Sequence, residues 1–155
     1  MKRIVGGNGV RQVWAAAAAS FEDRYIHGAL KLRITDDLRG HVTSHVPDTP
    51  GVYVISGVRG SESSVVYIGK AGTMTTTGQF KAQTLRGRLQ AKQHGISRIE
   101  FFRGKFLDEN WDALAVEWFI TFDAVNKTLP GKAEGELLQA YWDAHGCLPP
   151  WNAGY

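Results

Sequence analysis

Two short β-rich runs, residues 51–56 and 64–69, stand on either side of the mostly polar connector 57–63. Runs of this length around a short polar connector predict a β-hairpin. A third run, residues 114–122, places a large apolar side chain at every second position, and this alternation predicts a further strand. A chain with these three strands is expected to fold around a small sheet.

Helical periodicity covers the regions around these strands. Apolar side chains recur every three or four residues in 9–27, 80–94 and 133–144, which predicts three helices. Residues 30–34 predict a weak strand or a continuation of the first helix, and residues 98–106 predict another strand. Helices and strands are mixed without a regular βαβ alternation. The predicted class is therefore α+β, a small antiparallel or mixed sheet flanked by helices.

The chain has 155 residues, a length that suits one compact domain. Residues 47–51 hold two prolines and a glycine, so we expect the functional core at 47–155, with 1–46 as an N-terminal helical extension packed on it. No run approaches the ~20 apolar residues of a membrane span. The N-terminus only loosely imitates a signal peptide, and the single Cys147 cannot form an internal disulfide. We expect a cytoplasmic protein outside the membrane.

The positive charge is concentrated in the central third of the chain. Residues 59–105 hold nine basic and two acidic side chains, whereas residues 106–155 hold two basic and eight acidic ones. The net charge of the whole chain is only +3. A concentrated basic segment suits a polyanion such as nucleic acid, although a solvated basic face balanced by the acidic segment explains the charge equally well.

Several common sites are excluded by spacing. Gly69-Lys70 lacks the upstream glycine and the following Ser or Thr of a phosphate-binding loop, so we expect no nucleotide cofactor. The sequence has no paired cysteines and no His-Glu-x-x-His arrangement for zinc. His41 and His45 are four residues apart, but we expect them in a loop beside Pro47, as exposed histidines rather than metal ligands.

One set of residues remains that could carry chemistry. Tyr53 and Tyr67 lie in the two strands of the predicted hairpin, where their side chains can project from one face. Arg88 lies on the following basic helix, Glu134 opens the last helix, and Asn152 lies close to the chain end.

With these elements in this order, residues 50–152 resemble the GIY-YIG nucleases. Gly51-Val52-Tyr53 and Tyr67-Ile68-Gly69 look like the two segments that name the family. Arg88 followed by Leu89 looks like its helix arginine, and Glu134 followed by Leu137 and Leu138 looks like its metal-binding glutamate. Pro150-Trp151-Asn152 is similar to the terminal asparagine motif of the type II restriction branch.

The resemblance implies an endonuclease that hydrolyses phosphodiester bonds with Mg²⁺ or Mn²⁺ held by Glu134. Tyr53 is then the expected proton acceptor for the attacking water, and Tyr67 positions water or phosphate. Arg88 and Lys70 would offset negative charge in the transition state, and Asn152 would orient the site.

The resemblance also implies double-stranded DNA as the partner. The expected contacts come from the central basic segment, namely Lys70, Arg86, Lys92, Arg59, Lys81 and Arg103. The long loop after the second triplet and the Pro-Trp-Asn ending favour a restriction enzyme. Cleavage of a palindromic target would require a homodimer, because each active site cuts one strand.

Some positions leave alternatives open. Arg86 competes with Arg88, and Glu136 competes with Glu134. Many family members carry His or Tyr four residues beyond the arginine, whereas this chain has Lys92. The alternatives are a non-cleaving DNA-binding module of the same fold, a repair or toxin nuclease of the same superfamily, and a protein–protein adaptor whose tyrosines belong to the core.

Overall fold

The computed structural model describes residues 7–81, 84–90, 92–93 and 96–154. Its helices and strands, in chain order, are α1 (Gly7–Arg24), β1 (Ile26–Leu32), α2 (Leu38–His45), β2 (Gly51–Arg59), β3 (Glu62–Ala71), α3 (Leu85–Gln90), β4 (Lys92–Gln93), β5 (Ile96–Ser97), α4 (Arg98–Asp108), β6 (Ala113–Ile120) and α5 (Pro130–His145).

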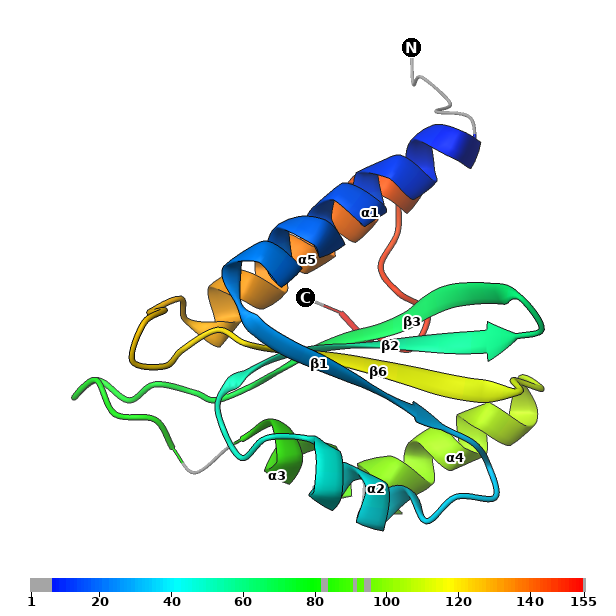
Figure 1. The fold of residues 1–155 in the computed structure, drawn as a ribbon, viewed down its shortest axis with the longest axis horizontal. Helices are drawn as coiled ribbons and strands as arrows, with labels where there is room; N and C mark the ends of the chain where they lie inside the picture. Colours follow the sequence, from blue (N-terminus) through cyan, green and yellow to red (C-terminus); the bar gives the residue numbers. More distant parts are fainter. Residues whose placement is uncertain (1–6, 82–83, 91, 94–95, 155) are drawn as a thin grey trace.

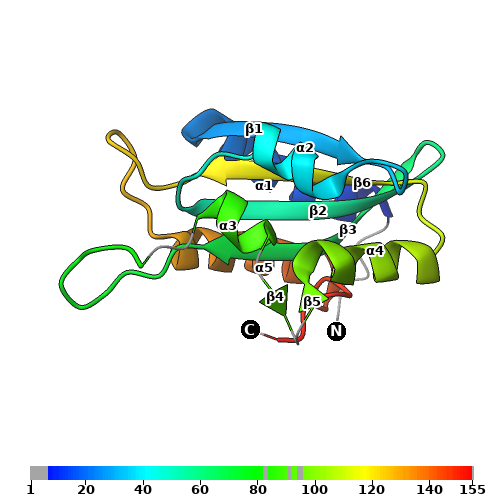
Figure 2. The same ribbon diagram turned by 90° about the horizontal axis from the view of Figure 1, so that it is seen from below.

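Four strands form one antiparallel sheet in the order β1-β6-β2-β3 (Figure 1). β4 and β5 pair separately (Figure 2). β2 lies between β6 and β3, and its residues 51–57 are buried. The predicted hairpin is confirmed as β2–β3, and the predicted strand 114–122 is confirmed as β6, which ends at Ile120. The α+β class is confirmed as well.

Helices cover both faces of this sheet. On one face α1 and α5 lie side by side (Figure 1), and Phe21 and Leu137 pack there against Val52 and Phe119 of the sheet. On the other face lie α2, α3 and α4 (Figure 2), where buried side chains from all three helices join the core side chains of β2. The sheet is therefore the middle layer of three, and a separate apolar core lies on each of its faces.

The N-terminal segment holds a strand as well as a helix, so of the two alternatives predicted for residues 30–34 the strand is the one that forms, although it begins earlier, at Ile26. α1 ends at Arg24, and β1 then joins the sheet as an edge strand in which Leu30 lies opposite Val116. The prediction that His41 and His45 lie in a loop is wrong. Both belong to α2, which begins after Asp37 because the Asp37 carboxylate accepts a hydrogen bond from the Gly40 backbone N–H.

The predicted strand at residues 98–106 is wrong, because this segment is helix α4. Phe102 and Phe106, one helical turn apart, both enter the core that lies against β2. A strand would also turn both rings to one face, so the spacing of the two phenylalanines does not by itself distinguish a helix from a strand.

Of the predicted helix at residues 80–94, the described residues outside 85–90 are not helical, and residues 82–83, 91 and 94–95 lie outside the described part of the chain. α3 covers only residues 85–90, and the Thr84 hydroxyl caps it by accepting a hydrogen bond from Gly87 N–H at 3.1 Å. Phe80 instead bridges to Met74 in a small hairpin, and its ring packs edge-on against Phe122 with centroids 4.8 Å apart. The last predicted helix is confirmed and begins earlier, at Pro130, because proline is tolerated in a first helical turn.

The segment after α5 returns to the outer edge of β3. Gly146, at φ 72°, ends the helix in a left-handed conformation that favours glycine. The Trp151 N–H then donates to the Val66 carbonyl at 2.9 Å. Val66 stands at a register shift of the β2–β3 ladder, so its carbonyl is available to this segment.

Among the described residues, none of the helices combines the length and apolar character needed to cross a membrane.

Candidate active site

The two motif tyrosines lie together on the face of the sheet that α3 and α4 cover. Tyr53 lies opposite Gly69 in the β2–β3 ladder, and Tyr67 lies opposite Ile55, two residues further along each strand. The Tyr53 and Tyr67 rings are 5.8 Å apart at their centroids and tilted by 33°. The hairpin therefore brings both rings to one place, as the sequence predicted.

Gly69 provides the space for this arrangement. A Cβ atom at Gly69 would lie 2.6 Å from Tyr67 Cε1 and 2.7 Å from Tyr53 Cζ. Both separations are far below a van der Waals contact, so the two rings occupy the volume that any other residue type would fill. The glycine of the second triplet is therefore required by the tyrosines themselves.

Arg98, the first residue of α4, joins the two hydroxyl groups. Its Nη1 donates to Tyr53 Oη at 3.1 Å and to Tyr67 Oη at 3.0 Å. Arg98 is only 5 % exposed. The sequence prediction did not single it out, because Arg98 reaches the tyrosines only through the tertiary packing of α4, a segment that was expected to be a strand.

Burial decides how the two hydroxyl groups differ. Tyr53 has no exposed surface (0 %), and its pKa is raised far above its ordinary value, first by desolvation and next by Tyr67. The positive charges of Arg98 and Arg88 act in the opposite direction but do not overcome burial. Tyr67 is partly exposed. These facts disfavour Tyr53 as the group that accepts a proton from water, since no water reaches it in this conformation.

Glu134 lies near two cations from other elements. Its pKa is raised by burial, while Lys70 of β3 and Arg88 of α3 act to lower it. Lys70 reaches the first turn of α5, because its Nζ lies 3.7 Å from where a Cβ of Gly131 would be. Arg88 also acts on Tyr53, so its charge lies within electrostatic range of both the tyrosines and the carboxylate. Between the two rivals, Glu136 is instead paired with Arg24 at 2.8 Å.

Asn152 contacts the backbone of the tyrosine strand rather than the grouped side chains. Its Oδ1 accepts a hydrogen bond from Ile68 N–H at 3.0 Å, and its Nδ2 donates to the Ile68 carbonyl at 2.8 Å. Trp151 holds this segment in place by donating from Nε1 to Glu109 Oε2 at 2.6 Å and by stacking on Phe102. Asn152 thus completes the edge of β3 next to Tyr67.

The basic residues predicted to contact DNA differ in whether their side chains already have partners within the protein. Arg59 donates to the backbone carbonyls of Glu109 and Asn110 after α4 and lies over the Trp111 ring. Arg86 donates from Nε to the Val46 carbonyl at 2.9 Å. Lys81 is exposed.

Two further predicted DNA contacts complete the set. Arg103 lies 3.9 Å from Glu100, and its Nε is buried without a hydrogen-bond partner. The side chain of Lys92 lies outside the described residues. Arg59 and Arg86 therefore have clear structural roles, and the packed guanidinium of Arg59 makes it the weakest DNA candidate.

The donor set around Glu134 fits one kind of metal ion. Across the described residues, no three His, Cys, Asp or Glu side chains lie close enough together to hold a metal. Mg²⁺ needs fewer protein ligands than that, since it keeps several waters and binds through one or two carboxylates together with substrate phosphates. A single half-buried carboxylate between two cations fits Mg²⁺ in this form and does not fit a closed zinc site.

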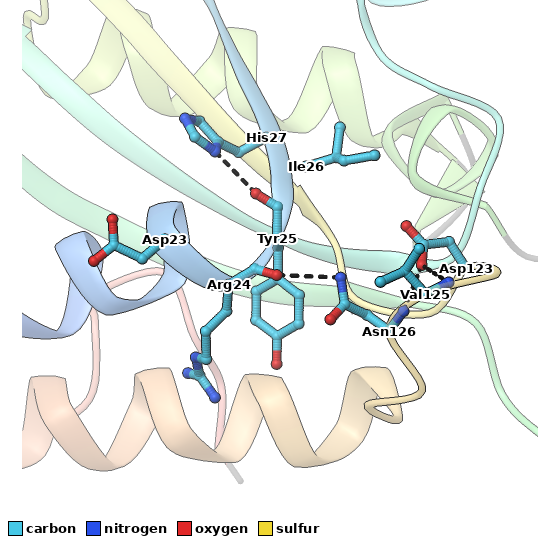
Figure 3. A pocket seen from close by; sticks show the side chains of 8 residues that line it. All are labelled: Asp23, Arg24, Tyr25, Ile26, His27, Asp123, Val125 and Asn126. Carbon is cyan, nitrogen blue, oxygen red and sulfur yellow. Dashed lines mark hydrogen bonds between the residues drawn. The ribbon is translucent and has the colours of Figure 1, made fainter.

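A separate pocket lies between the α1–β1 junction and the loop that follows β6 (Figure 3). Its volume is about 480 Å³. The Asn126 Nδ2 donates to the Arg24 carbonyl across it, and His27 Nδ1 lies 3.0 Å from the Tyr25 carbonyl oxygen. None of the predicted site residues lines this pocket.

No family model, no curated protein and no solved structure matches this chain.

Proposed function

We propose that this chain is a divalent-metal-dependent DNA endonuclease of the GIY-YIG kind. The observation that supports this most strongly is the grouping of Tyr53, Tyr67, Arg88, Lys70 and Glu134. These residues come from four elements, β2, β3, α3 and α5. Nothing in packing a core requires a glutamate, two cations and two tyrosine hydroxyls to share one neighbourhood, whereas phosphodiester hydrolysis needs all three types.

The charges of this group suit a phosphate. Arg88 and Lys70 would bind the phosphodiester and offset the negative charge that grows in the transition state. Glu134 would hold the Mg²⁺ or Mn²⁺, which when bound would polarise a phosphate oxygen and stabilise the leaving oxygen. The partner would be double-stranded DNA, attracted by the basic segment that includes Lys81.

The proton acceptor in this proposal is Tyr67 rather than Tyr53. Tyr67 is partly exposed and can meet a water molecule, whereas Tyr53 is fully buried. Tyr53 would then hold the Tyr67 side chain in position from its buried side. Asn152 would fix the β3 backbone next to Tyr67.

We further infer a restriction role in the cytoplasm, from the Pro-Trp-Asn segment and from the lone Cys147, which is exposed and unpaired. Cutting both strands of a palindromic target would then involve two copies of the chain.

A plasmid-nicking assay with a matched pair of variants tests the function. We expect the wild-type chain to nick plasmid with Mg²⁺ and not with EDTA, Glu134→Gln to lose cleavage, and Glu136→Gln to keep it. Glu136 is the right control because it lies two residues away and pairs with Arg24 instead. If wild type binds DNA without cutting it under any divalent metal, the non-cleaving module replaces the nuclease. If Glu136→Gln is the inactive variant, the metal carboxylate is misassigned.

A further inference from the structure

We infer that Arg98 is a positioning residue that joins the Tyr53 and Tyr67 hydroxyls into one proton-sharing pair and stabilises the pair after it has lost a proton. This inference rests on the proposed function, since it assigns a residue that prepares Tyr67 to accept a proton. The main support is that a single guanidinium nitrogen, Arg98 Nη1, donates to the hydroxyls of Tyr53 and Tyr67, at 3.1 and 3.0 Å.

The hydrogen-bond directions follow from chemistry. A guanidinium can only donate, so both hydroxyl oxygens accept from Arg98 and each keeps its own proton for another acceptor. The buried Tyr53 hydroxyl finds that acceptor in Tyr67, and this hydrogen bond is one cause of the raised pKa of Tyr53. Tyr53 therefore stays protonated, and Tyr67 is the member of the pair that solvent can reach, because it is partly exposed.

The deprotonated state would give the Tyr67 oxygen donors that already lie beside it, while Arg98 Nε stays buried without a hydrogen-bond partner. A phenolate on Tyr67 would accept from Arg98 Nη1, which already donates to this oxygen at 3.0 Å. It would also accept from the Tyr53 hydroxyl, whose hydrogen bond with Tyr67 is one cause of the raised pKa of Tyr53. Hydrogen bonds to the charged form of an acid lower its pKa. In the reaction, the phenolate would take a proton from water, and the resulting hydroxide oxygen would bond to phosphorus. The bond from phosphorus to the leaving oxygen would break, and the leaving oxygen would take up a proton from a second water.

The charge balance supports the same conclusion. Arg98 is 5 % exposed, and neither of the ion pairs among the described residues includes it. A buried cation is costly unless it meets a negative charge. The tyrosines are the groups that act on Arg98, and ionised Tyr67 would supply the missing charge. Phe102, whose ring lies 6.0 Å from that of Tyr67, anchors the same helix in the core.

Titration of tyrosine ultraviolet absorbance tests the pair without DNA or metal. We expect Tyr67→Phe to remove one ionisation from the wild-type titration. In Arg98→Gln, which removes the charge but keeps a donor, this ionisation should move up by about one pH unit or more, a tenfold loss of phenolate at a fixed pH. Arg98→Lys should move it less than Arg98→Gln does.

Lys105→Met is the matched control, because Lys105 is on the same helix and lies over Phe101 instead of a tyrosine. It should leave the tyrosine titration unchanged. An Arg98→Gln titration that coincides with wild type overturns the inference, and so does an equal shift in Arg98→Lys, which would assign the effect to packing alone.

A measurement on the wild-type chain keeps the inference testable if the Arg98 variants do not fold. The ¹⁵N signal of the Arg98 guanidinium should move at the pH where Tyr67 ionises, and an unmoved signal overturns the inference. Failure of the Arg98 inference can be distinguished from failure of the proposed nuclease function, because these titrations do not depend on cleavage. If wild type does cleave, the rise of kcat with pH should follow the Tyr67 ionisation and shift upward in Arg98→Gln.

Discussion

Gly69 faces Tyr53 across the β2–β3 ladder, and the Tyr53 hydroxyl lies 2.8 Å from where a Gly69 Cβ would be. A methyl group added to this glycine would therefore meet the ring of Tyr53 and that of Tyr67 at once. The arrangement of the two tyrosines therefore depends on the glycine, because both rings pack directly on the β3 backbone at Gly69.

Gly69→Ala should consequently damage the site and the fold together. We expect the free energy of unfolding to fall by about 1–3 kcal/mol, as for other overpacked positions. Cleavage should fall on the order of 10²-fold, because displaced tyrosines lose their alignment. Gly104→Ala is the control, since nothing lies within 4 Å of a Cβ there and alanine favours a helix by about 0.5–1 kcal/mol. Urea denaturation and kcat on plasmid measure both effects, and an active, stable Gly69→Ala would contradict the tyrosine arrangement.

Asn152→Asp should be more harmful than Asn152→Ala. The aspartate keeps the acceptor for Ile68 N–H but replaces the donor to the Ile68 carbonyl with a second oxygen, which repels it. We expect the free energy of unfolding to fall by about 1–3 kcal/mol in Asn152→Asp and by about 1 kcal/mol in Asn152→Ala. The loss is smaller for alanine because water can then hydrogen-bond to the exposed edge of β3. Chemical denaturation of both variants decides the order. Equal stability of Asp and wild type would show that the side-chain amide does not pair with β3.

Glu134→Gln should stabilise the chain at neutral pH while abolishing cleavage. Burial raises the pKa of Glu134 above its ordinary value of 4.5, so the native state holds this proton more tightly than the unfolded state does. The ionised carboxylate therefore costs stability that is absent below pH 4.5 and grows as the pH rises through the folded pKa. Urea denaturation should show the gain of Glu134→Gln at pH 7 and no gain at pH 4. A variant that is less stable at pH 7 would mean that attraction to Lys70 and Arg88 dominates.

Arg59→Ala and Lys81→Ala remove the same charge and should differ in effect. Arg59 holds the end of α4 and lies on Trp111, so its loss should lower the free energy of unfolding by about 1–2 kcal/mol without changing the salt dependence of DNA binding. Lys81 is exposed, so its loss should leave stability unchanged and reduce the salt slope by ~0.9 if it contacts one phosphate. Binding titrations at several salt concentrations separate the two, and a reduced slope for Arg59→Ala alone would reverse the assignment.

The strands that carry the tyrosines were predictable because their pattern is local. β2, β3 and β6 each have a run of β-branched and aromatic residues bounded by turn residues. Such residues favour the strand conformation because their side chains pack well on the surface of a sheet. α5 was predictable for the same reason, since Leu137, Leu138 and Tyr141 mark one buried face.

α4 was not predictable, because contacts distant in sequence decide it. Its residues Phe101, Phe102 and Phe106 favour a strand by intrinsic preference, and Gly104 disfavours a helix. The stacking of Phe102 on Trp151, far along the chain, is part of what compensates for this preference. Arg98 was missed with its helix, and the structural role of Arg59 was missed because its partners lie at the far end of α4.

The two apolar cores on either face of the sheet have a consequence for partial unfolding. Tyr53 belongs to the core under α3 and α4, whereas Glu134 is carried by α5, whose buried residues belong to the other core. If the α1–α5 layer were to open while the opposite layer stayed closed, the carboxylate would leave the tyrosines and the chain would lose activity without losing its sheet. Heating should then inactivate the protein below the temperature at which amide hydrogen exchange in β2 becomes fast, so that activity would report the weaker of the two layers.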